Sequence, residues 1–370
     1  SSHEKSFGLL LSLAINFSLR LMNPRNAPSG EVTKFSYTMP AGQERLYDRP
    51  TVETKEAILD VLATARAEQA SPVLTSLLGF DALRSNFVAH LSDEVDRLTN
   101  DELAKGFAHH CPAAGAEPND YKTRLVDLPG FGRALVGIRF RGLDLARPFV
   151  TVAASESLPN GQGELWAALA VIAEEFEVFA PKHLRVFLPS HSTLEPSRPG
   201  QFWEKRLLVG SVADMRKQPP PPGIDRLELA PPIDDGWYAR YEAAFERLVH
   251  DAPDYLEWTR LESRKDLAEL LQAGTLFEVS IDGRWAGVTA VALDGIEGVD
   301  GYLMIEILLA DHARGQGYGA ALQRRLVERL PDPEKLLLGT IDTRNLPAIR
   351  AATAVGRVDV GGYLWAEVSP

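Results

Sequence analysis

The stretch that decides the fold is YLMIEILLADHARGQGYGAALQRRLVERL, residues 302–330. Its apolar beginning predicts a strand, and apolar residues at helical spacing after the turn predict a helix. Three glycines, Gly315, Gly317 and Gly319, separate these elements. Glycine allows a sharp turn that brings backbone N–H groups close to an anion, and the positive end of the helix dipole adds to the attraction. We therefore expect a phosphate-binding loop between a strand and a helix.

Known phosphate-binding motifs fit this loop to different degrees. Arg314 stands at its entrance, where a guanidinium can meet a pyrophosphate. A P-loop is excluded, because no Lys-Ser or Lys-Thr pair follows the last glycine. The Rossmann fingerprint is met loosely, with Ala320 in its last position. Too few elements follow for a doubly wound sheet, however, and the preceding strands form an antiparallel pattern.

The flanking segments give the order of elements. Residues 275–295 alternate apolar and polar positions around Asp282-Gly283, which predicts a hairpin with a type I′ turn. Upstream we predict a strand at 227–229 and helices at 237–249 and 261–273; downstream we predict a strand at 335–341, a helix at 347–355 and a strand at 360–368. The predicted order is β-α-α-β-β-β-α-β-α-β.

These residues resemble the GNAT superfamily of acyl-CoA-dependent N-acetyltransferases, and the resemblance covers residues 224–370. Its core signature is matched by Arg314, Gly317 and Gly319. A second family segment is matched by NLPAIRAATAVGR, in which Asn345, Ala348 and Gly356 hold the expected spacing.

The resemblance implies that acetyl-CoA, or another acyl-CoA, lies in a wedge where the fourth and fifth strands separate. It implies direct transfer of the acyl group to a primary amine of a small molecule, peptide or protein, without a metal. The implied contacts are Leu308, Leu309 and Ala310 for the pantetheine arm, Arg314, Gly315, Gln316, Gly317, Tyr318, Gly319 and Ala320 for the pyrophosphate, and Asn345 near the thioester.

Two residues are candidate general bases. Glu306 stands among apolar strand residues, and burial there would raise its pKa. The alternative is a strand residue that faces solvent or pairs with an arginine. His312 is the second candidate, because imidazole titrates near neutrality; a solvated loop histidine is the alternative that the sequence favours.

The chain departs from the family pattern at two positions. Asp311 replaces a common proline, and Ala352 replaces the tyrosine that in many members protonates the departing thiolate. A non-catalytic acyl-CoA-binding or interaction protein is therefore the alternative function.

The N-terminal part resembles a second, degenerate copy. A proline-rich linker at 217–225 marks the boundary, and upstream we predict strands at 134–140, 148–153, 184–188 and 206–212 and a helix at 164–179. Asn160 replaces the loop arginine, and Leu165 replaces the third glycine, where we expect it to crowd the phosphates. A chance Gly-Gln-Gly loop on an unrelated α/β domain is the alternative.

The predicted fold class is α/β with mixed sheets: two tandem GNAT-like domains, each a mostly antiparallel mixed sheet flanked by helices. The predicted division is an extension at 1–30, the degenerate domain at 31–216, the linker at 217–225 and the acetyltransferase domain at 226–370.

Cysteine content and short local motifs bear on the cellular compartment, on metal binding and on membrane insertion. The single cysteine, Cys111, fits a reducing cytoplasm, and His109 and His110 beside it do not form a convincing metal site. The apolar run 7–15 is too short to span a membrane, and residues 1–21 lie before an alternative start at Met22.

The net charge of the chain and the position of its acidic residues indicate which partners it can bind. The net charge of -12 argues against nucleic acid. Acidic residues on the first two helices of the C-terminal domain favour a cationic acceptor: Asp234, Asp235, Glu242, Asp251, Asp254, Glu257 and Glu262. The sequence is compatible with a homodimer.

Overall fold

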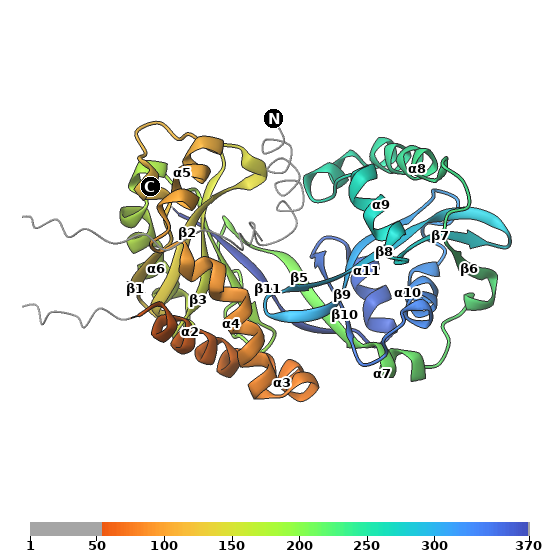
Figure 1. Cartoon of the computed structure of the whole chain (residues 1–370), viewed down its shortest axis with the longest axis horizontal. Coiled ribbons are helices and arrows are strands. Elements are labelled where there is room, and N and C mark those ends of the chain that lie inside the picture. Colours follow the sequence, from red (N-terminus) through yellow and green to blue (C-terminus); the bar gives the residue numbers. More distant parts are fainter. Residues whose placement is uncertain (1–53, 369–370) are drawn as a thin grey trace, which may run out of the picture.

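The structure is a computed structural model that describes residues 54–368, and its centre is one mixed sheet of 11 strands (Figure 1). The N-terminal half, residues 54–217, contains α2 (Lys55–Gln69), α3 (Pro72–Leu78), α4 (Phe80–Asp96), α5 (Asp101–His110), β1 (Arg124–Leu128), β2 (Gly132–Phe140), β3 (Pro148–Ser155), α6 (Gln162–Glu175), β4 (His183–Pro189), β5 (Gln201–Ser211) and α7 (Val212–Lys217). The C-terminal half, residues 224–368, contains β6 (Leu227–Ala230), α8 (Trp237–Asp251), α9 (Arg264–Gln272), β7 (Leu276–Ile281), β8 (Arg284–Ile296), β9 (Val299–Leu309), α10 (Tyr318–Arg329), β10 (Leu336–Asp342), α11 (Leu346–Ala354) and β11 (Val358–Glu367).

The order of elements in the C-terminal half confirms the prediction. Asp282 and Gly283 form the tight turn between β7 and β8, with φ of 51° and 75° as a type I′ turn requires. The second helix begins later than predicted, because Ser263 caps it by accepting a hydrogen bond from the Asp266 N–H at 3.1 Å.

The N-terminal half repeats this topology. Strands β1, β2 and β3 are antiparallel, α6 follows, and β4 pairs parallel with β3. In the same way β7, β8 and β9 are antiparallel, α10 follows, and β10 pairs parallel with β9. The mixed α/β class is therefore confirmed. The sequence alone assigns no element upstream of β2, where the structure places four helices and β1.

The two halves exchange their last strands. The sheet order is β1-β2-β3-β4-β11-β5-β10-β9-β8-β7-β6, so β11 lies between β4 and β5, and β5 lies between β11 and β10 (Figure 1). Leu364 of β11 is opposite Val186 on one side and Trp203 on the other. The sequence predicts a sheet in each half, whereas the structure joins both sheets into one through β5 and β11.

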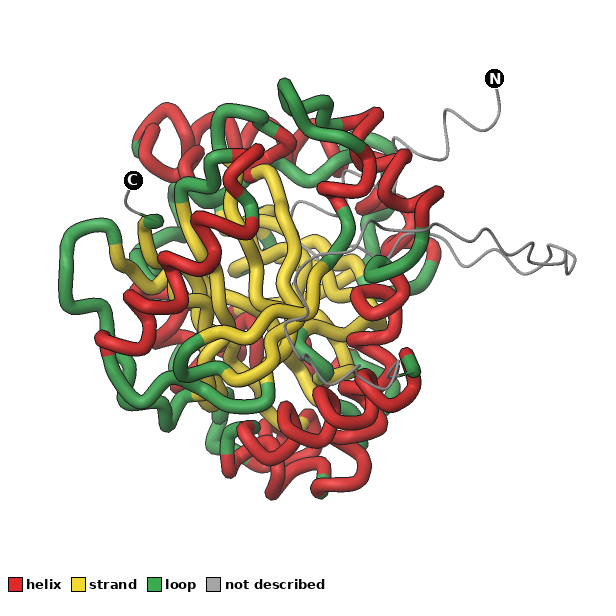
Figure 2. Tube along the Cα trace, turned by 90° about the vertical axis from the view of Figure 1, so that its left-hand side faces the viewer, coloured by secondary structure: helices red, strands yellow, loops and turns green. Residues whose placement is uncertain are grey.

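Helices cover both faces of this sheet (Figure 2). One face carries α6, which packs on the N-terminal strands, and α7 and α10, which pack on the C-terminal strands. The opposite face carries α8 and α9 on the C-terminal strands. On that face α2, α3 and α4 pack on strands of both halves, including Leu207 of β5, Leu338 of β10 and Val360 of β11. One hydrophobic core therefore spans the junction.

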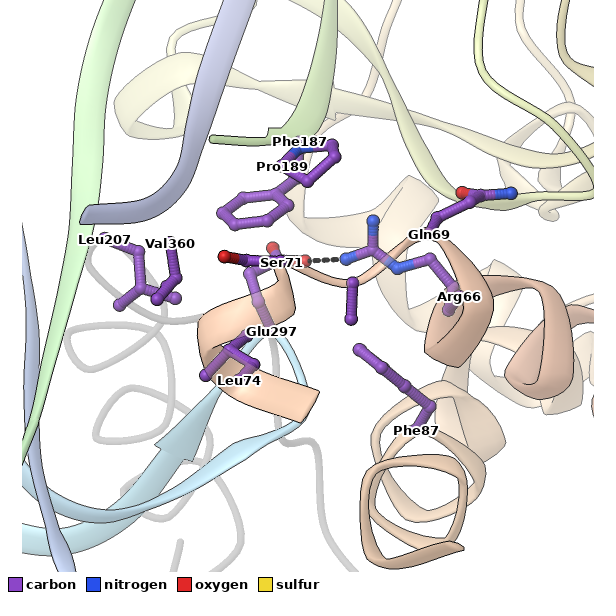
Figure 3. Close-up of a pocket in the computed structure, with 11 residues that line it drawn as sticks. Arg66, Gln69, Ser71, Leu74, Phe87, Phe187, Pro189, Leu207, Glu297 and Val360 are labelled. Carbon is purple, nitrogen blue, oxygen red and sulfur yellow. Dashed lines mark hydrogen bonds and ion pairs between the residues drawn. The ribbon is translucent and has the colours of Figure 1, made fainter. Parts of the chain in front are cut away.

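A buried polar network reinforces the junction (Figure 3). Arg66 of α2 forms an ion pair with Glu297, at the β8–β9 turn, at 2.6 Å. The Tyr363 hydroxyl of β11 donates to the other oxygen of Glu297 at 2.6 Å. Phe87 and Phe187 lie against the Arg66 guanidinium. The central carbon of the guanidinium is 5.3 Å from the centroid of each ring. The tip of a C-terminal hairpin is thus held inside the helical layer of the N-terminal half.

Within residues 54–368, no helix is long and apolar enough to cross a membrane. No group of three or more His, Cys, Asp or Glu side chains in this range is placed to hold a metal ion. The predicted extension at 1–30, with its apolar run, lies outside the described residues.

Candidate functional site

A wedge opens in the sheet between β9 and β10, where the family resemblance implies one. The two strands pair only where Gly301, Tyr302 and Leu303 are opposite residues 336–338. Beyond Leu303, β9 continues along β8 and β10 continues along β5. The facing edges of the two strands therefore carry backbone groups without a ladder partner in the sheet, which an extended ligand can bind.

The three residues predicted to contact the pantetheine arm differ in whether their backbone groups are free to bind it. The Ala310 N–H donates to the Ala286 carbonyl at 2.8 Å, and the Ala310 carbonyl accepts from the N–H groups of Ala313 and Arg314. Backbone direction alternates along a strand, so the N–H of Leu309 points away from β8, toward the wedge. The Leu308 side chain is buried against α8 and α9. Leu309 is thus the residue of the three with its backbone directed into the wedge.

The glycine loop, residues 314–319, leads from the wedge into α10. Gly315 and Gly317 have φ of 74° and 84°, a backbone conformation that disfavours other residues, and no atom lies within 4 Å of a Cβ added to either. Gly317 is the N-cap of α10, so the N–H groups of the first turn lack intrahelical acceptors and can bind an anion.

The third glycine also has a packing role. A Cβ on Gly319 would lie 3.0 Å from the Ala351 side chain, so this glycine allows α11 to approach α10. Tyr318 is buried beneath the Arg226 guanidinium and contributes its side chain to the core. Both residues remain available to an anion through their backbone N–H groups.

Two nitrogen atoms beside the glycine loop have unused hydrogen-bonding capacity. Arg314 Nη1 and His312 Nε2 are buried and have no hydrogen-bond partner among the described residues. The other terminal nitrogen of Arg314 is 3.4 Å from Asp251, and the Gln316 side chain donates to the His312 carbonyl at 2.6 Å. Buried donors without partners are costly. A diphosphate would accept from Arg314 Nη1, and from His312 Nε2 when that nitrogen carries a proton, so the residues present fit the anionic part of an acyl-CoA.

Glu306 lies on the free stretch of β9 and faces α8. The buried Tyr241 hydroxyl of α8 donates to its carboxylate at 2.5 Å, and the Glu262 N–H donates to the Tyr241 oxygen at 3.0 Å. Burial raises the pKa of Glu306 to about 7, although the Tyr241 hydroxyl and the Ile307 N–H lower it. Burial also raises the pKa of Tyr241, which therefore remains the donor. The partner of Glu306 is thus a tyrosine rather than an arginine.

A β-bulge sets the direction of Glu306. Ala290 of β8 is opposite Glu306, but the next residue, Val291, is opposite Met304, so Ile305 is an extra residue in β9. Tyr241 is a site residue that the sequence did not predict. The sequence pattern that could have identified it is its four-residue spacing from Trp237 and from Phe245, which places all three on the buried face of α8.

The remaining predicted site residues lie around β10 and α11. The half-buried Asn345 side chain caps α11 by accepting from the Ala348 N–H at 3.2 Å. Its amide nitrogen is not used in that bond and can donate to a ligand. Ala352 is fully buried in α11, so no titratable group occupies the position of the family tyrosine.

The N-terminal half has the same strand topology but no carboxylate at the position that corresponds to Glu306. Its third strand also carries a bulge, at Ala153, and Ala154 stands in the position that Glu306 has in β9. Glu164 accepts a hydrogen bond from the Asn160 N–H at 2.7 Å, which places a carboxylate at the start of α6. Contrary to the prediction, Leu165 is buried in the core and does not crowd this loop.

Residues 236–356 match the model of the acetyltransferase (GNAT) family, so this part of the chain is a GNAT domain. No curated protein matches the sequence.

Several solved structures are similar to the chain. A GCN5-related N-acetyltransferase from Sphaerobacter thermophilus has 14% identity and a TM-score of 0.42, over 84% of this chain and 93% of that one. A GNAT-family acetyltransferase from Colwellia psychrerythraea has 11% identity and a TM-score of 0.39, over 63% and 85%. A tandem GNAT protein from the clavulanic acid biosynthesis pathway has 16% identity and a TM-score of 0.35, over 74% and 97%.

Proposed function

We propose that the protein is an N-acyltransferase that transfers an acetyl group from acetyl-CoA directly to a primary amine. The observation that carries the proposal is the position of Glu306. A carboxylate with a pKa of about 7 lies on the wedge strand, and the same strand leads into a glycine loop with unsatisfied donors. A base with a pKa near the working pH is suited to proton removal, and the loop is suited to a diphosphate.

The reaction needs a neutral amine. In its ionised form Glu306 accepts a proton from the acceptor, directly or through one water. The amine nitrogen then attacks the thioester carbon, so a C–N bond forms as the C–S bond breaks, and the nitrogen releases its second proton to solvent to give the neutral amide. Backbone N–H groups on the free edge of β9 provide donors for the carbonyl oxygen, whose negative charge grows in the transition state.

The absence of a tyrosine at position 352 does not prevent this reaction. A thiol has a pKa of about 8.5, so the sulfur can leave as a thiolate near neutral pH and take a proton from solvent afterwards. The proton held by Glu306 returns to solvent in the same cycle. No covalent intermediate with the protein is required.

Ala352 also favours a second candidate, a protein that binds acyl-CoA without turnover. Release of CoA thiol from acetyl-CoA, measured with a panel of primary amines, separates the two functions. Thiol release that depends on amine and is lost in Glu306→Gln supports the enzyme. Tight binding of acetyl-CoA with no thiol release for any amine supports the non-catalytic protein.

A further inference from the structure

Five arginines from both halves gather near the wedge: Arg141 and Arg147 on either side of the β2–β3 turn, Arg185 of β4, Arg260 before α9, and Arg344 after β10. We call this group the arginine cluster.

The members of the cluster are linked by a shared carboxylate, by their mutual electrostatic effect and by a close approach of two loops. Arg141 and Arg185 converge on Glu204 of β5, at 3.2 Å and 3.6 Å. Burial lowers the pKa of Arg141, and the nearby charges of Arg147, Arg344 and Arg185 lower it further. A Cβ added to Gly142 would lie 3.2 Å from the Arg260 guanidinium, so the loop before α9 touches the β2–β3 turn. The cluster therefore crosses the junction of the two halves.

The arginine cluster is positively charged in an acidic protein. The carboxylates that form ion pairs with it, within residues 54–368, are Glu204, Asp342 and Glu257. Five guanidinium groups thus face three carboxylates, whereas the whole chain has a net charge of -12. Arg147 and Arg260 are exposed and form no ion pair in that range. Like charges held together repel unless an anion compensates them.

The arginine cluster lies on the same face of the sheet as Glu306. Arg344 binds Glu257, at the start of the loop before α9, at 2.6 Å. The end of that loop, Glu262, donates its N–H to the Tyr241 hydroxyl that holds Glu306. Four residues lie between these two points, which limits the separation of their Cα atoms to about 17 Å. The glycine loop enters α10, which covers the opposite face.

We infer that the acceptor carries an anionic group in addition to its amine, and that the arginine cluster binds this group while Glu306 receives the amine. Guanidinium groups suit this task because their paired N–H donors match carboxylate and phosphate oxygens. The inference rests on the proposed function and names the class of its substrate. It differs from the expected cationic acceptor, since Asp234, Asp251 and Glu257, three of the acidic residues behind that expectation, are engaged by arginines of the protein.

The test is calorimetric titration of the full chain, saturated with CoA, with ω-amino carboxylates of about three to eight carbons and with their neutral amides. At low ionic strength we expect the best carboxylate to bind at least about tenfold more tightly than its amide. Arg141→Gln should remove this preference. Arg260→Gln, at an exposed residue without an ion pair among those described, should reduce it without affecting folding.

Arg84→Gln is the matched control, because Arg84 forms a surface ion pair with Asp60 on the α2–α4 helices. It should keep the preference of the unaltered protein. ω-Aminoalkyl phosphates form the second arm: tighter binding than the carboxylates assigns the site to a phosphate, and weaker binding assigns it to a carboxylate.

The outcomes separate this inference from the proposed function. A carboxylate preference that depends on Arg141, without thiol release for any amine, supports the anion site and removes the enzymatic function. Equal kcat/KM for carboxylates and amides supports the enzyme and overturns the anion site. Equal binding of carboxylate and amide, or tighter binding of a diamine, also overturns it.

Discussion

The Tyr241 hydroxyl donates a hydrogen bond to the Glu306 carboxylate at 2.5 Å and thereby ties α8 to β9 just beyond the point where β9 leaves β10. The bond favours the ionised form of Glu306, while burial favours the protonated form, and the pKa of about 7 is the balance. The proposed base is therefore half ionised near neutral pH.

Tyr241→Phe removes a hydrogen bond that stabilises the ionised Glu306, so the pKa of Glu306 should rise. Since only the ionised form accepts a proton, the acid limb of the kcat/KM profile should move to higher pH. We expect the rate at pH 6 to fall by roughly three- to tenfold, and the rate above pH 9 to stay close to that of the unaltered protein. An equal loss at all pH values would show that Tyr241 acts on the fold instead.

Gly317→Ala should weaken binding of acetyl-CoA by about tenfold or more, because it places a methyl group in the glycine loop and strains a residue with a φ of 84°. Calorimetry of the full chain should find one site and its loss in this variant. Gly283→Ala is the matched control: Gly283 also has a positive φ, 75°, and open space around its Cβ, but lies in the β7–β8 turn. Equal weakening in both variants would contradict the site, and two sites would mean that the N-terminal half also binds.

Cutting the chain between the halves should not separate them. A protease site placed at residues 219–222 leaves β5 beside β10 and β11 beside β4. We expect the two fragments to elute together in size-exclusion chromatography. Residues 226–370 expressed alone should fail to fold, because β11 loses both neighbours and β10 loses β5. A soluble, cooperatively unfolding fragment would contradict the shared sheet.

Arg66→Met should reduce the free energy of unfolding by about 3–5 kcal/mol, because it leaves Glu297 buried without its ion pair. Arg84→Met removes a surface pair between α4 and α2 and should cost about 0–1 kcal/mol. Denaturant unfolding at neutral pH measures both values. Equal, small losses would show that the Arg66–Glu297 pair does not hold the halves together.

Sequence periodicity predicts elements whose signals are local. The hairpin at Asp282-Gly283 and the helix after Gly317 depend on turn chemistry and spacing within a few residues, and both occur as predicted. The candidate base, Glu306, is also visible as a charged residue in an apolar strand.

The exchange of β5 and β11 is not visible in the sequence. Only the end of β5 and the middle of β11 are apolar, and a buried strand can pair with several neighbours without a change in its own pattern. The arginine cluster depends on the same long-range contacts, since its members come from both halves of the chain, from residue 141 to residue 344. Tyr241 meets Glu306 only when α8 packs on β9.

The most direct test of the central claim is the pH dependence of thiol release by Glu306→Gln, with acetyl-CoA and an amine that the unaltered protein accepts. We predict a fall in kcat of about 100-fold or more, an almost unchanged KM for acetyl-CoA, and loss of the acid limb near pH 7. Unfolding of the variant, measured alongside, should show no loss of stability, because glutamine carries no charge that burial would penalise. An unchanged rate and an unchanged limb near pH 7 would contradict the assignment of Glu306 as the base.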